Sequence, residues 1–405
     1  MSKILYIVLI LLNTIIRIFT DDKTFKLSSR GEKGVAITSF TKNLYLVSSS
    51  KSNNIINQYY QIILNNNNIQ TQTPFGKNFE MVESSINRKT NESMLLIADS
   101  TTNKINIYSY NITGPIIENK NPKLLDSIST EVSNKKISLL SMGNDKYLLS
   151  YCMSNNKIAF KLFKYASYEG YQSKGNIAYD LNSNRLNNYL VSCFLLYEQF
   201  PVCLYSEKSI IAGENKYSLN LIALNLVFNL YDDIINPNNI IGEQSNNFLF
   251  FKAIYFSDDY FAFCYYYEGN DKVYCDLRKI IIDFSSSQFS ISIIPSSSQQ
   301  EIQPCSNDLY KFDLIKVDND KIMVCCENSD HQNINFALIN VNNDFTLNSP
   351  NIKTKEKDVK TTLTLFSYEL YNNNYGIIFD DSNNIVNYEF IDLLICSGNQ
   401  DNIKV

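Results

Sequence analysis

The chain of 405 residues contains no tryptophan and a single histidine, His331. One histidine excludes a histidine-rich metal site, and any Ser-His-Asp or Cys-His catalytic device would have to use His331. The residues around it form a polar loop without a nucleophile motif, and G-x-S-x-G is absent from the chain. No C-x-x-C pair occurs either, which removes the zinc-ribbon and thioredoxin-type interpretations. We therefore predict no catalytic residue, no metal site and no cofactor.

Clustered positive charge is also lacking. The 36 Lys and Arg residues are scattered among 41 Asp and Glu residues, for a net charge of −5. Without a basic stripe, nucleic acid is not expected as a partner. Glycine is scarce (12 residues) for a chain with many turns, and asparagine can replace it because it tolerates the left-handed backbone. The asparagine run 65–68 is accordingly predicted to be a loop.

The N-terminus carries an apolar run that is too short to span a membrane. Lys3 precedes the mostly apolar segment Ile4–Ile16, which matches the charged and apolar regions of a secretory signal peptide, whereas a spanning helix needs about 20 apolar residues. We predict a signal peptide over residues 1–20 and no membrane span in the mature chain. The residues before Asp21 lack a small-x-small cleavage pattern, so an uncleaved anchor or a buried segment stays an alternative.

The rest of the chain is a repeated strand pattern. Short apolar runs are separated by Asn/Asp turns, and no segment keeps a 3.6-residue period over three turns. The repeats begin near Val35, Phe79, Ile137, Tyr189, Phe250, Phe312 and Leu363. A period of about 40–60 residues built only from strands is typical of a β-propeller, in which each sheet covers its faces by packing against its neighbours. Segments such as 114–131 and 289–304 can supply a fourth strand.

We therefore predict an all-β fold. It is a β-propeller of seven blades, each with three to four antiparallel strands, over residues 21–396, followed by a polar tail at 397–405. Six blades, or a pair of β-sandwiches with an accidental period, are the alternatives.

Hairpin geometry suggests two disulfides among the nine cysteines. The two-residue turn Gly269-Asn270 places Cys264 opposite Cys275, and directly opposed antiparallel residues lie within disulfide range. A three-residue loop at 197–199 would place Cys193 opposite Cys203, although Pro201 then falls inside a strand. Disulfides are expected in an oxidising compartment, in agreement with the leader.

Other cysteines and the modification sites are less constrained. Cys305 could pair with Cys325 or Cys326, and Cys152 and Cys396 have no evident partner. The triplets that begin at Asn91 and Asn111 match the N-glycosylation pattern, and are meaningful only if the leader exports the chain.

Carboxylates are the remaining candidates for chemistry. Asp318-Asn319-Asp320 resembles half of a calcium loop, but it lacks the glycine of such loops and has Ile322 where an oxygen ligand should follow. We interpret it, and Asp258-Asp259, as ordinary hairpin turns. Propeller-shaped glycosidases use paired carboxylates in a central pocket. Here no sialidase-type box is present, and 28 tyrosines would have to replace the usual tryptophans.

The leader and the seven divergent, asparagine-rich repeats resemble the secreted or cell-surface propeller proteins of AT-rich unicellular eukaryotes. This resemblance of pattern implies an extracellular interaction module. Our leading hypothesis is a secreted or surface-exposed, non-catalytic binding or adhesion module whose ligand is an extracellular protein or a glycan. The alternatives are a secreted glycosidase-like hydrolase with paired carboxylates in an axial pocket, and a structural coat protein.

Overall fold

A computed structural model describes the β-strands and most of their tight turns. The described residues are 25–26, 35–41, 44–51, 54–63, 66–71, 79–87, 92–99, 104–111, 123–128, 132–142, 146–153, 157–166, 170–180, 185–197, 200–225, 233–257, 259–283, 290–295, 299–303, 305, 312–327, 333–356, 364–367, 375–380 and 386–391. All regular elements within these ranges are β-strands, and every strand pairing is antiparallel. The prediction of an all-β, antiparallel fold is therefore confirmed.

The described strands form seven sheets, numbered here in chain order. Sheet 1 holds β2 (Val35–Thr41), β3 (Leu44–Lys51), β4 (Asn54–Ile63) and β5 (Asn66–Thr71). Sheet 2 holds β6 (Phe79–Asn87), β7 (Glu92–Asp99), β8 (Lys104–Asn111) and β9 (Lys123–Ile128). Sheet 3 holds β10 (Val132–Ser141), β11 (Lys146–Met153), β12 (Lys157–Ala166) and β13 (Gly170–Asp180). Sheet 4 holds β14 (Arg185–Leu196), β15 (Phe200–Ile211), β16 (Glu214–Asn225) and β17 (Asp233–Gln244).

The last three sheets vary this plan. Sheet 5 holds β18 (Phe248–Ser257), β19 (Tyr260–Tyr267), β20 (Val273–Asp283) and β21 (Ser290–Pro295), with the short β22 (Gln300–Ile302) also paired to β20. Sheet 6 holds β23 (Phe312–Asp318), β24 (Lys321–Glu327), β25 (Asn333–Asn340) and β26 (Asn351–Glu356). Sheet 7 holds β27 (Thr364–Ser367), β28 (Tyr375–Asp380), β29 (Val386–Ile391) and the N-terminal β1 (Phe25–Lys26).

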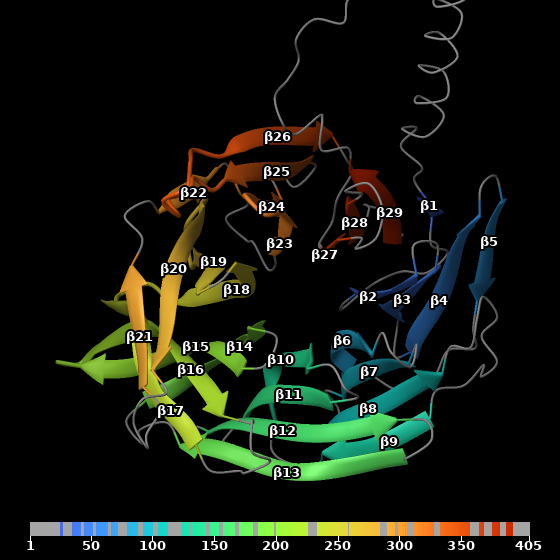
Figure 1. Ribbon diagram of the computed structural model, residues 1–405, viewed down its shortest axis with the longest axis horizontal. Coiled ribbons are helices and arrows are strands. Elements are labelled where there is room, and N and C mark those ends of the chain that lie inside the picture. Colours follow the sequence, from blue (N-terminus) through green and yellow to red (C-terminus); the bar gives the residue numbers. More distant parts are fainter. Residues whose placement is uncertain are drawn as a thin grey trace, which may run out of the picture.

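The first strands of the sheets lie around a common centre (Figure 1). They contact one another in chain order, and β27 of sheet 7 returns to contact β2 of sheet 1. The N-terminal strand β1 pairs with β29 as the outermost strand of sheet 7, so the two ends of the described chain share one sheet. This pairing ties the last sheet to the start of the chain.

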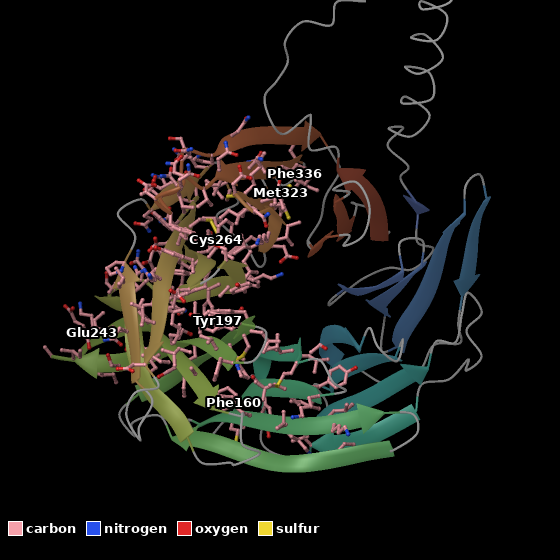
Figure 2. All side chains as sticks on the ribbon, viewed as in Figure 1. Phe160, Tyr197, Glu243, Cys264, Met323 and Phe336 are labelled. Atoms are coloured by element: carbon pink, nitrogen blue, oxygen red, sulfur yellow. A yellow bond between two sulfur atoms is a disulfide. The ribbon has the colours of Figure 1, made fainter. Side chains whose placement is uncertain are left out.

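The core lies between neighbouring sheets. Successive side chains of a strand point to opposite faces, so a strand that is apolar at nearly every position needs a partner on both sides. β19 is such a strand, and its buried residues divide between two clusters. Phe261 and Phe263 pack toward sheet 4, whereas Ala262 and Cys264 pack toward sheet 6. A third cluster joins sheet 3 to sheet 4 and includes Tyr205 and Phe160, which is labelled in Figure 2.

Asparagine and proline lie within strands at two places. The prediction of a loop at the asparagine run 65–68 is wrong, because Asn66 begins β5, which pairs with β4 at the edge of sheet 1. An edge strand is hydrogen-bonded on one side only, so polar residues of low strand propensity are tolerated there. Pro201 lies within β15, but the ladder between β15 and β16 begins at Val202, so its missing N–H removes no hydrogen bond from that ladder.

Phe261 offers a test of packing between sheets. Its ring is fully buried and stacks on Phe194 of sheet 4 with centroids 5.2 Å apart. Phe261→Ala should lower the free energy of unfolding by about 3–5 kcal/mol, since it removes a buried ring and leaves a cavity. Ile294→Ala, at a position that is 49% exposed, should change it by no more than about 0.5 kcal/mol. Equal shifts of the two variants in urea unfolding would contradict this account of the core.

Candidate functional site

The candidate site lies at the end of the sheets that carries the turn between the first and second strands. Because neighbouring strands are antiparallel, the first and third turns of a sheet emerge at the same end, and the second turn emerges at the other. At the first end, the turns of sheets 4, 5 and 6 contribute an aromatic and charged surface. We call this surface the loop-face patch, and it consists of Tyr197, Asp259, Tyr260, Lys279 and Phe345.

Asp259 and Tyr260 connect the patch across three sheets. The hydroxyl of Tyr197, directly after β14, donates a hydrogen bond to the carboxylate of Asp259 in the β18–β19 turn. The next residue, Tyr260, stacks on Phe345 of the β25–β26 loop, with ring centroids 3.7 Å apart and planes 4° from parallel. Two consecutive residues of sheet 5 therefore contact one aromatic side chain each: Asp259 contacts Tyr197 of sheet 4, and Tyr260 contacts Phe345 of sheet 6.

A charge pair lies inside the patch. The ammonium of Lys279, in β20, is 3.4 Å from the Asp259 carboxylate, and about a third of each side chain is exposed. The same ammonium lies 5.8 Å from the centre of the Tyr260 ring, within the range of a cation–π contact. The opposite charges cancel, so the patch has no net formal charge while keeping donors and acceptors partly in water.

Backbone conformation marks two of the patch residues. Tyr197 has φ of 51° and Phe345 has φ of 59°. Bulky residues seldom adopt this left-handed region, which costs of order 1–3 kcal/mol. The loop of Phe345 is fixed by local hydrogen bonds: the backbone N–H of Phe345 donates to the carbonyl of Asn342 at 2.9 Å, and Asp344 accepts from the hydroxyl of Thr346 at 2.7 Å. The bonds from Thr346 lower the pKa of Asp344.

Tyr197 is the most accessible aromatic residue of the patch. The residue is 37% exposed, although its ring also contacts Phe200 at a centroid distance of 6.4 Å and an interplanar angle of 88°. The ring is thus anchored at its hydroxyl and supported at its side, and it remains partly in water. This combination suits a contact surface for a ligand.

The site as a whole is not predictable from the sequence, since its residues come from three repeats. A local signal was nevertheless present. Tyr197, Tyr260 and Phe345 are large aromatic residues in or beside tight turns, where Gly, Asn, Asp, Ser and Pro normally dominate. The turn at Asp258-Asp259, predicted to be an ordinary hairpin turn, therefore carries part of the candidate site at Asp259.

The structure brings both expected cysteine pairs together. Cys193 lies opposite Cys203 between β14 and β15, and Cys264 lies opposite Cys275 between β19 and β20. Each pair forms a disulfide with Cα atoms 4.1 Å apart. The turn at Gly269 (φ 74°) sets the second register.

A third disulfide resolves an open choice. Cys305 pairs with Cys326, with Cα atoms 6.0 Å apart, while Cys325 is buried next to it in β24. Successive residues of a strand point to opposite faces, so only one of the two cysteines can face Cys305. Cys152 lies in β11, and Cys396 lies outside the described residues.

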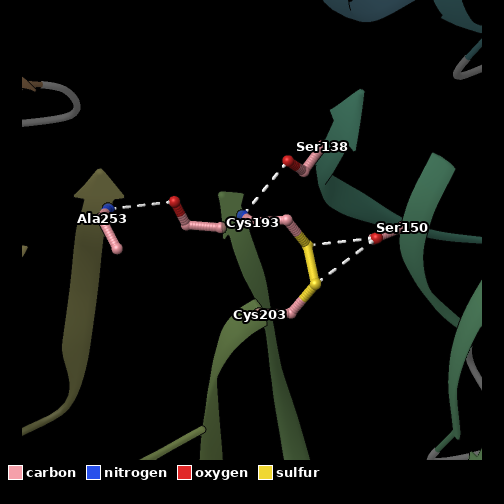
Figure 3. Close-up of a disulfide and its surroundings, with 6 residues drawn as sticks. Ser138, Ser150, Cys193, Cys203 and Ala253 are labelled. Carbon is pink, nitrogen blue, oxygen red and sulfur yellow. Dashed lines mark hydrogen bonds between the residues drawn. A yellow bond between two sulfur atoms is a disulfide. The ribbon is translucent and has the colours of Figure 1, made fainter. Parts of the chain in front are cut away.

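Figure 3 shows how the first disulfide connects to neighbouring sheets. The hydroxyl of Ser150 lies 3.1 Å from the sulfur of Cys193, and the backbone N–H of Cys193 donates to the hydroxyl of Ser138 at 3.3 Å. One sheet further on, the N–H of Ala253 donates to the hydroxyl of Ser192 at 3.1 Å. These hydroxyls therefore link the inner strands β10, β14 and β18.

Between sheets 5 and 6, an ion pair replaces the hydroxyl hydrogen bonds. Lys252 of β18 contacts Asp313 of β23, whose side chain is 2% exposed. In β14, Cys193 contacts the preceding sheet and Ser192 the following one. In β18, Ala253 and Lys252 repeat this arrangement, so the Lys252–Asp313 ion pair joins sheet 5 to sheet 6 as Ser192 joins sheet 4 to sheet 5. Since the carboxylate is held by a cation, it fits a structural pair better than a free acid or base.

Asp276 is a buried carboxylate with a raised pKa. Burial in β20 is the main cause, and the guanidinium of Arg278, 2.8 Å away, opposes it. Arg278 also donates to the carbonyl of Ile240 in sheet 4. A raised pKa can indicate a catalytic acid. The Asp276 carboxylate, however, is bound to Arg278, which connects sheet 5 to sheet 4, so its role is structural.

Of the other residues considered in the sequence, Asn111 ends a strand and Asp318 and Asp320 flank a turn. Asn111 is the last residue of β8, and its backbone pairs with Glu92. The Asp318-Asn319-Asp320 segment makes the β23–β24 turn, where both carboxylates lie within 4 Å of the Lys321 ammonium, at 3.8 and 3.1 Å. Within the described residues, no group of three or more His, Cys, Asp or Glu side chains could hold a metal ion. Asn91, Asp258, His331, the leader 1–20 and the tail 397–405 lie outside the described residues.

Comparison with known proteins adds little to this picture. No family model matches the chain, and no curated protein matches it. One similar solved structure is that of an α-L-arabinofuranosidase from Fusarium graminearum in complex with an iminosugar inhibitor, with a TM-score of 0.46 and 10% identity over 78% of this chain and 93% of that one. A similarity at this level transfers no site residue to this chain. In the part of the chain that the structure describes, no helix has the length and apolarity to cross a membrane.

The Cys264–Cys275 disulfide should contribute measurably to stability. Replacing both cysteines by alanine removes a cross-link across an 11-residue separation, which should lower the free energy of unfolding by about 2–4 kcal/mol. Cys325→Ala is the control for lost packing, because it removes a buried sulfur but leaves all three disulfides described above intact. If chemical denaturation shows the same loss for both variants, the cross-link itself contributes nothing.

Asp276 predicts a pH dependence. Its pKa is higher in the folded chain than the ordinary 3.8, so the folded state holds the proton more tightly. Stability therefore falls as pH rises from about 4 through the folded pKa, and the loss is complete above it. Relative to Asp276→Asn, the wild type should be less stable at pH ~7 than at pH ~4 in urea unfolding. An increase in relative stability over that range would show that Arg278, and not burial, dominates.

Proposed function

We propose that the chain is a seven-bladed β-propeller that acts outside the cell as a non-catalytic binding module, with the loop-face patch as its contact surface. The blade assignment is supported by seven sheets whose first strands contact in chain order and return to the beginning. The pairing of β1 with β29 supports closure of that ring, because it joins strands from both ends of the chain.

Three disulfides support an extracellular location, since such bonds persist in oxidising compartments. In this proposal residues 1–20 are a cleaved signal peptide, residues 21–396 are the propeller, and Asn91 and Asn111 carry glycans. N-terminal sequencing of the secreted chain and its mass before and after glycosidase treatment test these assignments. An intact leader on an exported chain would contradict the cleavage.

The observation that carries the binding function is the exposure of Tyr197 within a fixed set of side chains. Aromatic anchors that are rigid and partly in water lose little conformational entropy on binding, which is why they are enriched in contact surfaces. Three buried carboxylates have side-chain partners: Asp276 and Asp313 are bound to the cations of Arg278 and Lys252, and Glu207 accepts a hydrogen bond from the side-chain amide of Asn220 at 2.8 Å. A hydrolase would need a carboxylic acid that can exchange its proton with substrate.

Binding of the labelled, full-length chain to intact cells of its source organism tests this function. Tyr197→Ala should weaken binding by about tenfold or more, because loss of a central aromatic anchor commonly has an effect of this size. Ile210→Ala is the matched control, since Ile210 is 56% exposed near the second turn of sheet 4, at the opposite end of the sheet. Unchanged binding by Tyr197→Ala, or turnover of fluorogenic glycosides by the wild type, would contradict the proposal.

A further inference from the structure

We infer that the loop-face patch binds a neutral carbohydrate chain, with the Tyr197 ring as a stacking surface and Asp259 and Lys279 as its hydrogen-bonding partners. This inference rests on the proposed binding function and specifies its ligand. It is carried by three features of the patch: its aromatic faces, its balanced charge and its rigid placement.

The aromatic residues match the apolar side of a sugar ring. A pyranose has a face of C–H groups and a rim of hydroxyls, so it needs a flat apolar surface bordered by donors and acceptors. Tyr197 supplies a ring that is 37% exposed, and Phe345, which stacks on Tyr260, supplies a second ring that is partly exposed. Tyrosine is suited to such contacts because its body is apolar and its tip is polar.

The charged residues supply the rim. Asp259 offers carboxylate oxygens and Lys279 offers ammonium hydrogens, and about a third of each side chain is exposed. Their pairing leaves no net charge, so an anionic ligand gains nothing from the patch as a whole. The β23–β24 turn lies beside the loop of Phe345, since the N–H of Val341 donates to the carbonyl of Asp320 at 2.7 Å. That turn adds Asp318 and Asp320 against Lys321, which disfavours sulfated or sialylated glycans.

The patch is fixed before any ligand arrives. Tyr197 is held by Asp259, Asp259 by Lys279, and Phe345 by stacking on Tyr260. Prior fixation reduces the entropy lost on binding, and this matters for sugars because each contact with them is weak.

A large protein partner fits the described surface less well. A stable protein interface buries about 800 Å² on each side around an apolar centre. Among the residues whose side-chain burial the structure describes, the exposed large hydrophobic ones lie in or directly beside strands of sheets 4 and 5: Tyr197, Ile210, Ile211, Leu249, Ile281 and Ile294. Tyr197 is the only member of that group within the patch, so the patch offers aromatic faces with a polar rim and not an aliphatic interface.

A glycan array probed with the full-length chain tests the inference. Neutral oligosaccharides should bind, sulfated and sialylated ones should not, and binding should change by less than about threefold between ~50 and ~500 mM salt, since no net charge is involved. In titration calorimetry with the best neutral oligosaccharide, Tyr197→Ala should weaken affinity by about tenfold or more. Tyr197→Trp should keep or improve it, because the larger ring preserves stacking, and Ile210→Ala should leave it unchanged.

Three outcomes would overturn the inference. They are no binding to any neutral glycan, binding only to anionic glycans with strong salt dependence, or neutral-glycan binding that a folded Tyr197→Ala variant retains. Circular dichroism and the Tm of each variant establish that it is folded. Cell binding that is lost in Tyr197→Ala but survives periodate oxidation of the cell-surface glycans would leave the binding function standing and remove its carbohydrate ligand.

Discussion

The contact between the faces of neighbouring sheets is the interaction on which the rest of this structure depends. β19 is buried at all but its first residue, and its alternate side chains fill two different clusters, one toward each neighbour. A single antiparallel sheet with two such faces cannot be stable alone, because both faces would meet water. The sheets therefore stabilise one another, and a ring order of contacts lets each described sheet have two neighbours.

Polar contacts at the same junctions define how the sheets meet. Apolar packing tolerates small shifts, whereas a hydrogen bond does not, so Ser138 to Cys193 and Ser192 to Ala253 fix the relative height of adjacent inner strands. Lys252 and Asp313 occupy the corresponding place one junction later. A partly buried ion pair of this kind adds little net stability, but breaking it is costly, so we attribute to it a role in alignment.

The sequence predicts this fold best where geometry is local. A turn of known length fixes the pairing of the strands beside it, which is why counting outward from Gly269-Asn270 reaches Cys264 and Cys275. The prediction is wrong or stays open where tertiary context decides. The asparagines of β5 have low strand propensity but pair at a sheet edge, and the partner of Cys305 depends on which face of β24 meets it. The loop-face patch joins residues 197, 259–260, 279 and 345, and no spacing rule relates these positions.

In the loop-face patch, the same contacts align neighbouring sheets and orient the residues of the candidate site. The left-handed conformations of Tyr197 and Phe345 are unfavourable in isolation and persist because contacts with sheet 5 compensate for them. Those contacts come from Asp259 and Tyr260, so the residues that align three sheets also set the orientation of the exposed rings. The hydroxyl of Tyr197 serves the alignment while its ring remains available to a ligand. Tyr197→Phe therefore separates the two roles, because it removes the bond to Asp259 but keeps the ring face.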